Sequence, residues 1–299
     1  MADQQSPWVS LSSGLLRAQV DPHGAQLSTL QDKSGRDLLW NGDPAVWAGR
    51  APLLFPIVGT LAGGQYRLGS SIYRLPRHGF ARAQQFEVLS ATAAEATFRL
   101  RADAATLQVY PFQFELEARF ALEDSSLTVT ASVRNTGART MPASFGYHPA
   151  FRWPLPFGQP RSAHYLEFET DEPEPIRRLD GDGLLSPHSY PTPIRARGLA
   201  LSDALFTNDV VIFDAVRSRS VSYGAPLGPR LRVSYPDAPY LGLWTKPGAG
   251  FICIEPWHGL ADPAGFSQDF TAKPGVFALT PGSVRRIVMQ IELLGEAPT

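Results

Sequence analysis

The sequence predicts an all-β protein built as an antiparallel sandwich, and two observations carry this prediction. Apolar residues alternate with polar residues through many short segments, which is the period of a strand with one buried face. The chain also holds 26 Gly and 27 Pro among its 299 residues, and these interrupt it too often for long helices. Short strands without intervening helices favour a sandwich over alternating strand–helix units.

The elements follow from this alternation. Residues 112–120 and 127–133 form the clearest pair, a long hairpin with an Asp-Ser-Ser break at 124–126. Helix signals are confined to 103–109 and to a turn near 201–205. In chain order, the predicted strands cover residues 15–20, 25–31, 65–68, 72–75, 84–91, 95–101, 112–120, 127–133, 163–169, 209–214, 219–223, 230–235, 240–245, 250–255 and 285–293.

Two stretches rich in Pro, Gly and charged residues, 154–160 and 171–193, have the composition of loops. Strand patterning resumes on both sides of them without a shift in composition. We therefore expect residues 1–299 to form a single domain with a core of about 15–293, although the length alone would allow two domains.

Composition and charge exclude several classes of partner. The 27 basic and 28 acidic side chains leave a net charge of −1, so no broad field favours nucleic acid or an anionic membrane. Cys253 is the one cysteine, which excludes an intramolecular disulfide and any multi-cysteine metal site. The first residues lack a signal-peptide pattern, and the longest apolar stretch, 51–58, is too short to span a bilayer. We expect a cytoplasmic monomer or homodimer without nucleic-acid or membrane partners.

Four segments combine reactive side chains with Gly, Pro and aromatic residues. They are WAGRAPLLFPIVGTL with Arg50, RHGFAR with His78 and Arg82, SFGYHPAF with His148, and FICIEPWHGLAD with Glu255, His258 and Asp262. A carboxylate and histidines beside aromatic rings are suited to acid–base chemistry on a polyol that stacks on the rings.

Glu255 is the strongest single candidate. It follows the apolar run FICI and precedes Pro256, which we expect to end the strand and to hold residue 255 extended. A carboxylate at the end of a buried strand is costly to desolvate unless it is paired or functional. The alternative is a structural Glu in a salt bridge, or a solvated one at the strand end.

The other candidates also have structural alternatives. His148 precedes Pro149 and so lies on extended chain, where a lone histidine is more often a satisfied core residue. His78 precedes Gly79, which lets a ligand or backbone approach closely, and its alternative is a turn histidine. Arg50 is either part of a strand-edge ion pair or a fork that donates to sugar hydroxyls.

Motifs of other chemistries are absent from the sequence. It has no Gly-rich phosphate loop followed by Lys, no dinucleotide fingerprint, no HExxH and no GxSxG. The segment CIEPWH has neither the spacing nor the ligand number of a zinc site.

Five segments in order resemble the aldose 1-epimerases, also called galactose mutarotase-like proteins. They are PHGAQLSTLQDKSGRDLLW, GRAPLLFPIVG, RHGFAR, GYHPAF and IEPWHGLAD. The resemblance extends from about residue 15 to 293. It implies a large antiparallel β-supersandwich, a small-molecule sugar as partner in an open cleft on one face, and catalysis without a metal or organic cofactor.

The resemblance also implies roles at single positions. Glu255 matches the family's catalytic base and His148 its general acid. The substrate-binding positions fall on His78, Arg50, Asp209 and Trp244. Asp203 and Asp214 lie near enough in the sequence to leave open which aspartate faces the sugar.

The function expected from the resemblance is interconversion of the α- and β-anomers of an aldose. Ionised Glu255 would take the proton of the anomeric hydroxyl while protonated His148 donates to the ring oxygen. One alternative is a sugar-phosphate 1-epimerase of the same fold, with cations from Arg50, Arg77 and Arg82. Another is a non-catalytic carbohydrate-binding protein. A glycoside hydrolase ranks lower, because it needs two facing carboxylates and only Glu255 stands in a strong motif.

Overall fold

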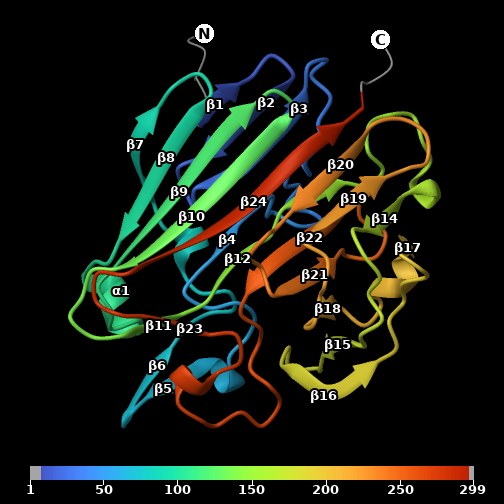
Figure 1. The fold of residues 1–299 in the computed structure, drawn as a ribbon. Coiled ribbons are helices and arrows are strands. Elements are labelled where there is room, and N and C mark those ends of the chain that lie inside the picture. The colour runs from blue at the N-terminus through green and yellow to red at the C-terminus, as the bar shows by residue number, and fades with distance from the viewer. Residues whose placement is uncertain (1–7, 296–299) are drawn as a thin grey trace.

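The computed structural model describes residues 8–295, and most of its elements are strands of antiparallel sheets (Figure 1). One large sheet has nine strands. In spatial order they are β17 (Gly198–Ala200), β14 (Tyr165–Phe168), β19 (Ser220–Gly224), β20 (Arg230–Ser234), β24 (Val284–Leu294), β10 (Ser126–Asn135), β9 (Phe114–Glu123), β8 (Glu95–Arg101) and β7 (Glu87–Ala91).

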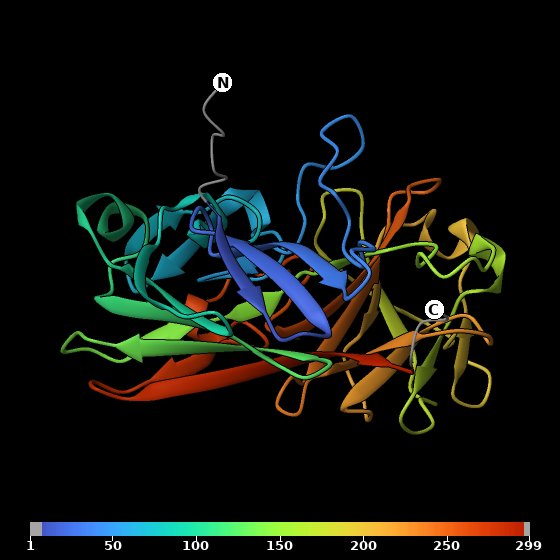
Figure 2. The ribbon, with the colours of Figure 1, turned by 90° about the horizontal axis from the view of Figure 1, so that it is seen from above.

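A second large sheet has eight strands and carries the candidate site. In spatial order they are β16 (Leu185–Tyr190), β15 (Ile176–Leu179), β18 (Val211–Phe213), β21 (Tyr240–Trp244), β22 (Phe251–His258), β12 (Phe145–Tyr147) and β4 (Leu53–Leu54), and β13 (Ala150–Arg152) also pairs with β22. Seen from above, the nine-stranded sheet forms the lower layer, and the segment between β3 and β4 rises on the other side (Figure 2).

The remaining elements are short. Three further sheets contain β1 (Val9–Ser12), β2 (Leu16–Asp21) and β3 (Gln26–Asp32); β5 (Gln65–Leu68) and β6 (Ser71–Arg74); and β11 (Met141–Ala143) and β23 (Phe277–Leu279). The helices are α1 (Ala104–Val109) and the 3-10 turns η1 (Ala62–Gly64), η2 (Ala81–Ala83), η3 (Arg161–Ala163), η4 (Asp203–Phe206) and η5 (Phe270–Ala272). None of the helices in residues 8–295 is long and apolar enough to cross a membrane.

The main core lies between the two large sheets and follows from the alternation in the sequence. Every second residue of β9 and β10 is buried, and the two strands pair in register over their full length, as the hairpin pattern predicts. Tyr147 of β12 links the layers, because its hydroxyl lies within hydrogen-bonding distance of backbone atoms of Val129, Ala131 and Ile287. This contact fixes the strand end that immediately precedes His148.

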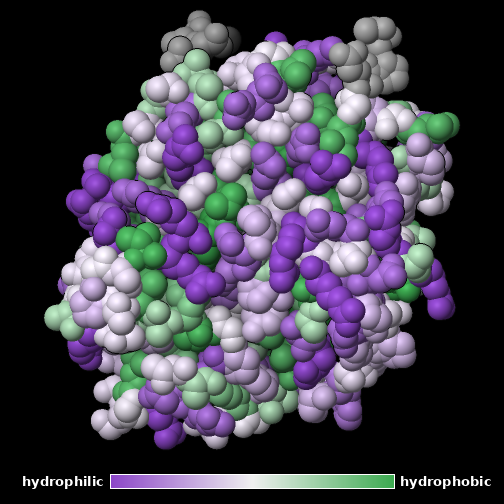
Figure 3. Space-filling model, in the orientation of Figure 1, coloured by the Kyte–Doolittle hydropathy of each residue, from purple (hydrophilic) through white to green (hydrophobic). Residues whose placement is uncertain are grey.

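The outer face of the nine-stranded sheet is polar. Its strands present ion pairs between neighbouring strands, including Arg119 with Glu95 and Arg232 with Glu292. In Figure 3 this face is mostly purple and white, with green only in scattered places. The alternation therefore separates a buried face from a solvated one, as in a sandwich layer.

The predicted all-β antiparallel fold is confirmed, and every predicted strand overlaps an observed one. The helix predicted at 103–109 is α1, which begins after Asp103, whose side chain accepts from Thr106 N. The interpretation of 171–193 as a loop is wrong, since it contains β15 and β16. These strands extend the sheet edge and were hidden by the Pro-rich composition.

Candidate active site

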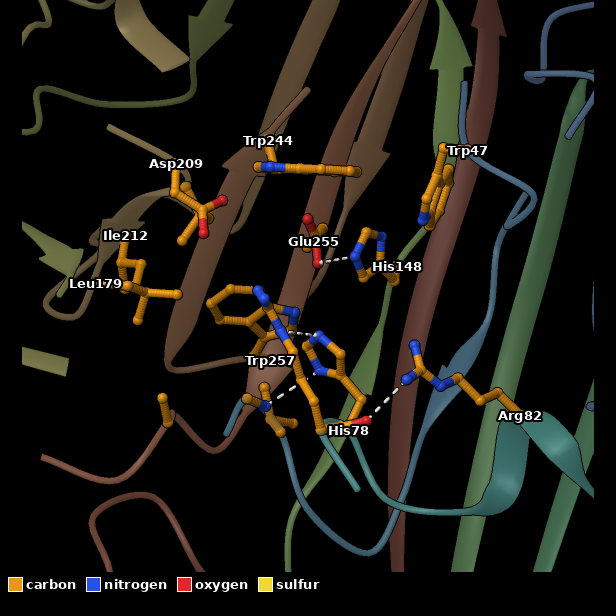
Figure 4. Close-up of a pocket in the computed structure, with 15 residues that line it drawn as sticks. Trp47, His78, Arg82, His148, Leu179, Asp209, Ile212, Trp244, Glu255 and Trp257 are labelled. Atoms are coloured by element: carbon orange, nitrogen blue, oxygen red, sulfur yellow. Dashed lines mark hydrogen bonds and ion pairs between the residues drawn. The ribbon is translucent and has the colours of Figure 1, made fainter. Parts of the chain in front are cut away.

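A cavity of about 340 Å³ opens on the side of the eight-stranded sheet that faces away from the nine-stranded sheet (Figure 4). It is lined by Trp47, Val58, Gly59, Arg77, His78, Arg82, His148, Leu179, Asp209, Val210, Ile212, Trp244, Glu255, Trp257 and Ala261. The cavity therefore gathers two acidic residues, two histidines, two arginines and three tryptophans from segments far apart in the chain.

Strand β22 presents Glu255 to this cavity. Alternate residues of the strand face opposite sides, so Cys253, Glu255 and Trp257 share the cavity side while Ile252 and Ile254 enter the core between the sheets. The Glu255 side chain is 1% exposed, although it carries the site's central carboxyl group. Its paired residue on β21 is Gly242, and the Trp257 indole packs over this glycine so closely that a Cβ there would lie 2.4 Å from the ring.

The expectation that Pro256 ends the strand is wrong, because β22 continues to His258. Ile254 N donates to Pro149 O, in the segment between β12 and β13. Backbone nitrogens two residues apart on a strand point toward the same neighbouring strand, so the nitrogen of residue 256 points to this side as well. β13 pairs with residues 251–253 of β22 and β12 with residues 257–258, so position 256 faces the gap between them. Pro256 therefore removes no ladder hydrogen bond, and Glu255 lies inside the strand.

His148 lies in that gap between β12 and β13. Its Nε2 atom is 3.2 Å from Glu255 Oε2. The Trp47 indole stacks on the imidazole with ring centroids 5.1 Å apart, and the Trp244 indole meets it edge-on at 6.0 Å. The two tryptophans exclude water from one side of the acid–base pair and leave aromatic surface at the cavity.

Burial sets the protonation of this pair. It raises the pKa of Glu255 well above its usual range, and the nearby Arg77 cation opposes this only partly. Burial, with smaller contributions from the Arg77 and Arg82 cations, also lowers the pKa of His148 to about 3. Burial thus favours neutral Glu255 beside neutral His148 over the ion pair that the expected ring-opening step uses. Both forms hold one proton and differ only in which residue carries it.

Several polar atoms at this pair have no partner. Glu255 Oε2, His148 Nδ1 and Trp257 Nε1 are buried and make no well-aligned hydrogen bond with any part of residues 8–295. Buried polar atoms are nearly always hydrogen-bonded in proteins, and exceptions call for an explanation. A polar ligand in the cavity would supply the missing partners.

His78 is held in one tautomer. Gly59 N–H donates to its Nδ1 atom at 3.1 Å, so in the neutral ring Nε2 must carry the proton. Burial first, then the neighbouring His148, lower the pKa of His78 well below its usual range, which keeps the ring neutral. Arg77 Nε also lies at hydrogen-bonding distance, 3.2 Å, from Nε2. A neutral ring accepts at only one nitrogen, and the buried backbone N–H of Gly59 is fixed, whereas the exposed Arg77 side chain can turn away when Nε2 carries the proton. His78 Nε2–H is therefore a donor at the cavity wall.

The backbone at His78 explains the glycine that follows it. His78 and Gly79 both have positive φ values, 68° and 72°, so the chain turns through the left-handed region at two successive residues. A Cβ atom at position 79 would lie 2.2 Å from Phe55 O. Only glycine allows this turn to pack against β4 and to direct the imidazole into the cavity.

Arg77 and Arg82 add positive charge to the same wall. Both residues are solvent-exposed and line the cavity. Arg82 donates to the backbone oxygen of Arg77 at 2.8 Å, and neither arginine forms an ion pair within residues 8–295. Two cations without a protein carboxylate therefore lie beside the acid–base pair.

Asp209 is the aspartate that lines the cavity, on the side away from Arg82 (Figure 4). It has a φ of 61°, and Arg178 supports this turn by donating to Asp209 O at 2.9 Å. Asp203 is instead bound to Arg161, and Asp214 pairs with Arg177. Among the three aspartates considered from sequence, Asp209 is the one with access to a ligand.

Arg50 does not reach the cavity, so its predicted position in the site is wrong. Its Nη1 atom donates to Ser28 O at 2.6 Å, and its guanidinium lies 5.0 Å from the Trp8 ring centroid. The hydrogen bond to the Ser28 carbonyl oxygen holds the Arg50 side chain away from the cavity. The structure thus brings together Glu255, His148, His78, Asp209 and Trp244 and leaves Arg50 outside.

Sequence analysis missed Trp47 and Trp257. Trp47 stands in the same motif as Arg50, where the arginine drew attention. Trp257 was detectable, because it lies two residues after Glu255 and a strand places such residues on one face. The residue that stacks on His148 could not be found without the fold, since 101 positions separate it from the histidine.

Three buried residues form the one group within residues 8–295 that could hold a metal ion. His148, Cys253 and Glu255 each have a ligand atom within 4.8 Å of the others. Burial raises the pKa of Cys253 well above its usual range, whereas a metal binds the thiolate. Arg77 and Arg82 also oppose a dication here. The group therefore fits a metal poorly, and catalysis without one remains a prediction.

Comparison with known proteins agrees with the fold. The aldose 1-epimerase family model matches residues 7–265, and the chain belongs to this family. The chain is 34% identical over 289 residues to the chromosomal protein LacX of Lactococcus lactis subsp. lactis, covering 91% of this chain and 95% of LacX.

Two solved structures are also similar. A galactose mutarotase related enzyme from Lactobacillus acidophilus has a TM-score of 0.88 at 29% identity, covering 96% of this chain and 97% of its own. A galactose mutarotase-like protein from Lactobacillus casei has a TM-score of 0.88 at 28% identity, covering 96% and 99%. The resemblance seen in the sequence is confirmed at the level of family and fold.

Proposed function

We propose that this protein is an aldose 1-epimerase that interconverts the α- and β-anomers of an aldose, with Glu255 and His148 as its acid–base pair. The observation that carries the proposal is the 3.2 Å separation of His148 Nε2 and Glu255 Oε2 inside a cavity with tryptophan walls. The anomeric hydroxyl and the ring oxygen of a sugar share one carbon, so two adjacent proton-transfer groups can serve both.

Ring opening needs the ion-pair form of the couple. Glu255 removes the proton of the anomeric hydroxyl, His148 donates its proton to the ring oxygen, and the C1–O5 bond breaks to give the free aldehyde. Both residues end neutral, which is the form that burial favours. Desolvation therefore favours this proton-transfer step and, by the same amount, disfavours the ion-pair form from which it starts.

Ring closure reverses both transfers after rotation about the C1–C2 bond. Neutral Glu255 returns a proton to the carbonyl oxygen while His148 accepts one from the C5 hydroxyl, and attack from the other face of the aldehyde gives the other anomer. His78 Nε2–H donates to an oxygen of the sugar and the Asp209 carboxylate accepts from hydroxyls. Trp244 and Trp47 offer stacking surfaces.

Polarimetry tests this proposal. Freshly dissolved α-D-glucose and α-D-galactose are followed with the wild type and with Glu255→Gln. Acceleration by the wild type alone supports the reaction and the base together. Equal acceleration by both proteins contradicts the role of Glu255. If neither accelerates the change while tryptophan fluorescence titration still shows sugar binding, the protein is a non-catalytic carbohydrate-binding protein for these sugars.

A phosphorylated aldose is a second candidate substrate, and the two unpaired arginines of the cavity favour it. Arg77 and Arg82 supply the positive charge that a phosphate group requires. Inorganic phosphate should then compete with the sugar. Replacement of both arginines by leucine should lower kcat/KM for an aldose phosphate about tenfold or more relative to its effect on the free aldose.

Arg74→Leu is the matched control for this second candidate, since Arg74 is an exposed arginine on β6 that does not line the cavity. Absence of phosphate competition, or equal losses on free and phosphorylated sugar, would contradict a phosphate-binding role.

A further inference from the structure

Beneath the His78 side of the cavity lies a buried ion pair that the mechanism above does not use. Lys273 Nζ is 2.5 Å from Asp262 Oδ1, and the two side chains are 0% and 4% exposed. Neither residue lines the main cavity. Removing two charges from water is costly, so a buried ion pair is weak evidence for a contribution to stability. The other contacts of this pair indicate its role.

Asp262 holds the turn between β4 and β5 with both its side chain and its backbone. Its Oδ2 atom accepts from Ala62 N at 2.8 Å, and its own N–H donates to Thr60 O at 2.9 Å. The preceding residue, Ala261, packs so closely on Gly59 that a Cβ at position 59 would lie 2.6 Å from Ala261 Cα. The turn at 59–62 is therefore clamped against 261–262.

The same turn determines the tautomer of His78. Gly59 O accepts from His78 N at 2.9 Å, and Gly59 N donates to His78 Nδ1 at 3.1 Å. A small rotation of the turn would withdraw the Gly59 N–H and let the ring place its proton on Nδ1 instead. His78 would then present an acceptor to the cavity and lose the donor at Nε2.

We propose that Asp262 and Lys273 are positioning residues, which hold the 59–62 turn so that Gly59 keeps His78 in the Nε2–H form that donates to the sugar. The donation to the sugar rests on the proposed function, but the tautomer of His78 can be measured in the protein without sugar. Lys273 forms an ion pair with the Asp262 carboxylate, and this carboxylate accepts a hydrogen bond from Ala62 N. The turn fixed in this way makes the two hydrogen bonds between Gly59 and His78.

Two variants separate this role from a general loss of structure. Ala62→Pro removes the N–H that Asp262 accepts and puts a ring carbon in its place, which separates the carboxylate from the turn. Proline suits the first position of η1, since Leu61 before it is extended at φ −95° and ψ 144°. The pair Asp262→Ala with Lys273→Met removes both charges together, so that no lone charge stays buried. Asp262→Asn with Lys273→Met restores an acceptor oxygen and should rescue.

Asp32→Asn is the matched control. Asp32 is also a buried carboxylate that pairs with a basic side chain, Arg36, and accepts backbone N–H groups at Ser34 and Arg36. It does not line the cavity. Its replacement should lower stability and leave the His78 tautomer and the rate unchanged.

The first measurement is nitrogen-15 NMR of the histidine side chains without sugar, with His78→Gln to assign the signals. The wild type, the rescue pair and the Asp32 control should show His78 in the Nε2–H form. Ala62→Pro and the alanine–methionine pair should show a mixture of both tautomers. A folded Ala62→Pro protein that keeps a single Nε2–H tautomer would overturn the proposal.

The second measurement is the mutarotation rate in a double-mutant cycle. Ala62→Pro should lower kcat/KM about tenfold, the worth of one well-placed hydrogen bond, and should have no further effect in a His78→Gln background. Equal losses in both backgrounds would show a merely structural role. If the wild type does not accelerate mutarotation, the proposed function fails while the tautomer measurement still judges this inference.

Discussion

Replacing Glu255 by Gln changes one buried carboxyl into an amide of nearly the same shape. The side chain is 1% exposed and its Oε2 atom has no aligned partner in residues 8–295, so the amide leaves the packing of β22 unchanged. The proton-accepting group of the proposed mechanism is lost. One positioned proton-transfer group is worth about 10²–10⁴-fold, which corresponds to about 3–5 kcal/mol of barrier.

The same substitution should raise stability at neutral pH. Burial raises the pKa of Glu255, so the folded protein retains a proton that the unfolded chain releases above about pH 4.3. Stability contributed by this group is therefore lost as pH rises, by up to about 1.4 kcal/mol per pH unit until the raised pKa is reached. Gln removes this loss, and the stability difference between variant and wild type should grow from pH 5 to pH 8.

Polarimetry and denaturant unfolding at pH 5 and pH 8 measure both effects on the same preparations. The expected result is a variant that is at least a hundredfold slower and gains stability over the wild type with rising pH. A variant that is slow because it is unfolded would refute the assumed packing. A stability difference independent of pH would refute the raised pKa of Glu255, and unchanged activity would refute its role as base.

Three further predictions concern the surroundings of this residue. The acid–base pair must hold one proton. Because the pKa of His148 is lowered to about 3, the wild-type rate should lack an acid limb near pH 6.5, and it should fall on the alkaline side as Glu255 ionises. Initial rates from pH 4.5 to 9 check this, and an acid limb near 6.5 would contradict it. Trp47→Ala exposes the His148 imidazole that the indole covers, which should raise the pKa of His148. An acid limb should then appear at higher pH than in the wild type, and KM should rise. An unshifted pH profile would show that Trp47 does not control the pKa of His148. Gly79→Ala should cost about 2–4 kcal/mol in denaturant unfolding, from its positive φ and the contact with Phe55 O, whereas a cost under about 1 kcal/mol would mean that the turn relaxes freely.

Local pattern explains the parts of the fold that sequence analysis found. The hairpin of β9 and β10 is visible because each strand is ten residues long and alternates without interruption. α1 is visible because Asp103 caps it. Most of the missed strands, such as β4, β12 and β13, are two or three residues long, too short to show a period. Their pairing with neighbours creates them.

The residue types of the site were readable from sequence, but their directions were not. Glu255, His148 and His78 stand in motifs where proline or glycine marks an unusual backbone, and all three line the cavity. Arg50 stands in an equally suggestive motif, yet Ser28 O captures its guanidinium. A side chain's partner depends on which distant backbone passes beside it, and no local pattern records that.

The sequence by itself determined the class of fold, the family and several of the residues that line the cavity, because alternation, turn residues and motif order are local properties of the chain. Only the tertiary structure decided that Trp47 covers His148, that Pro256 faces a gap and leaves Glu255 inside its strand, and that burial makes the neutral form of the acid–base pair the favoured one. These outcomes depend on strand register and on the exclusion of water, which arise only when segments far apart in the chain pack together.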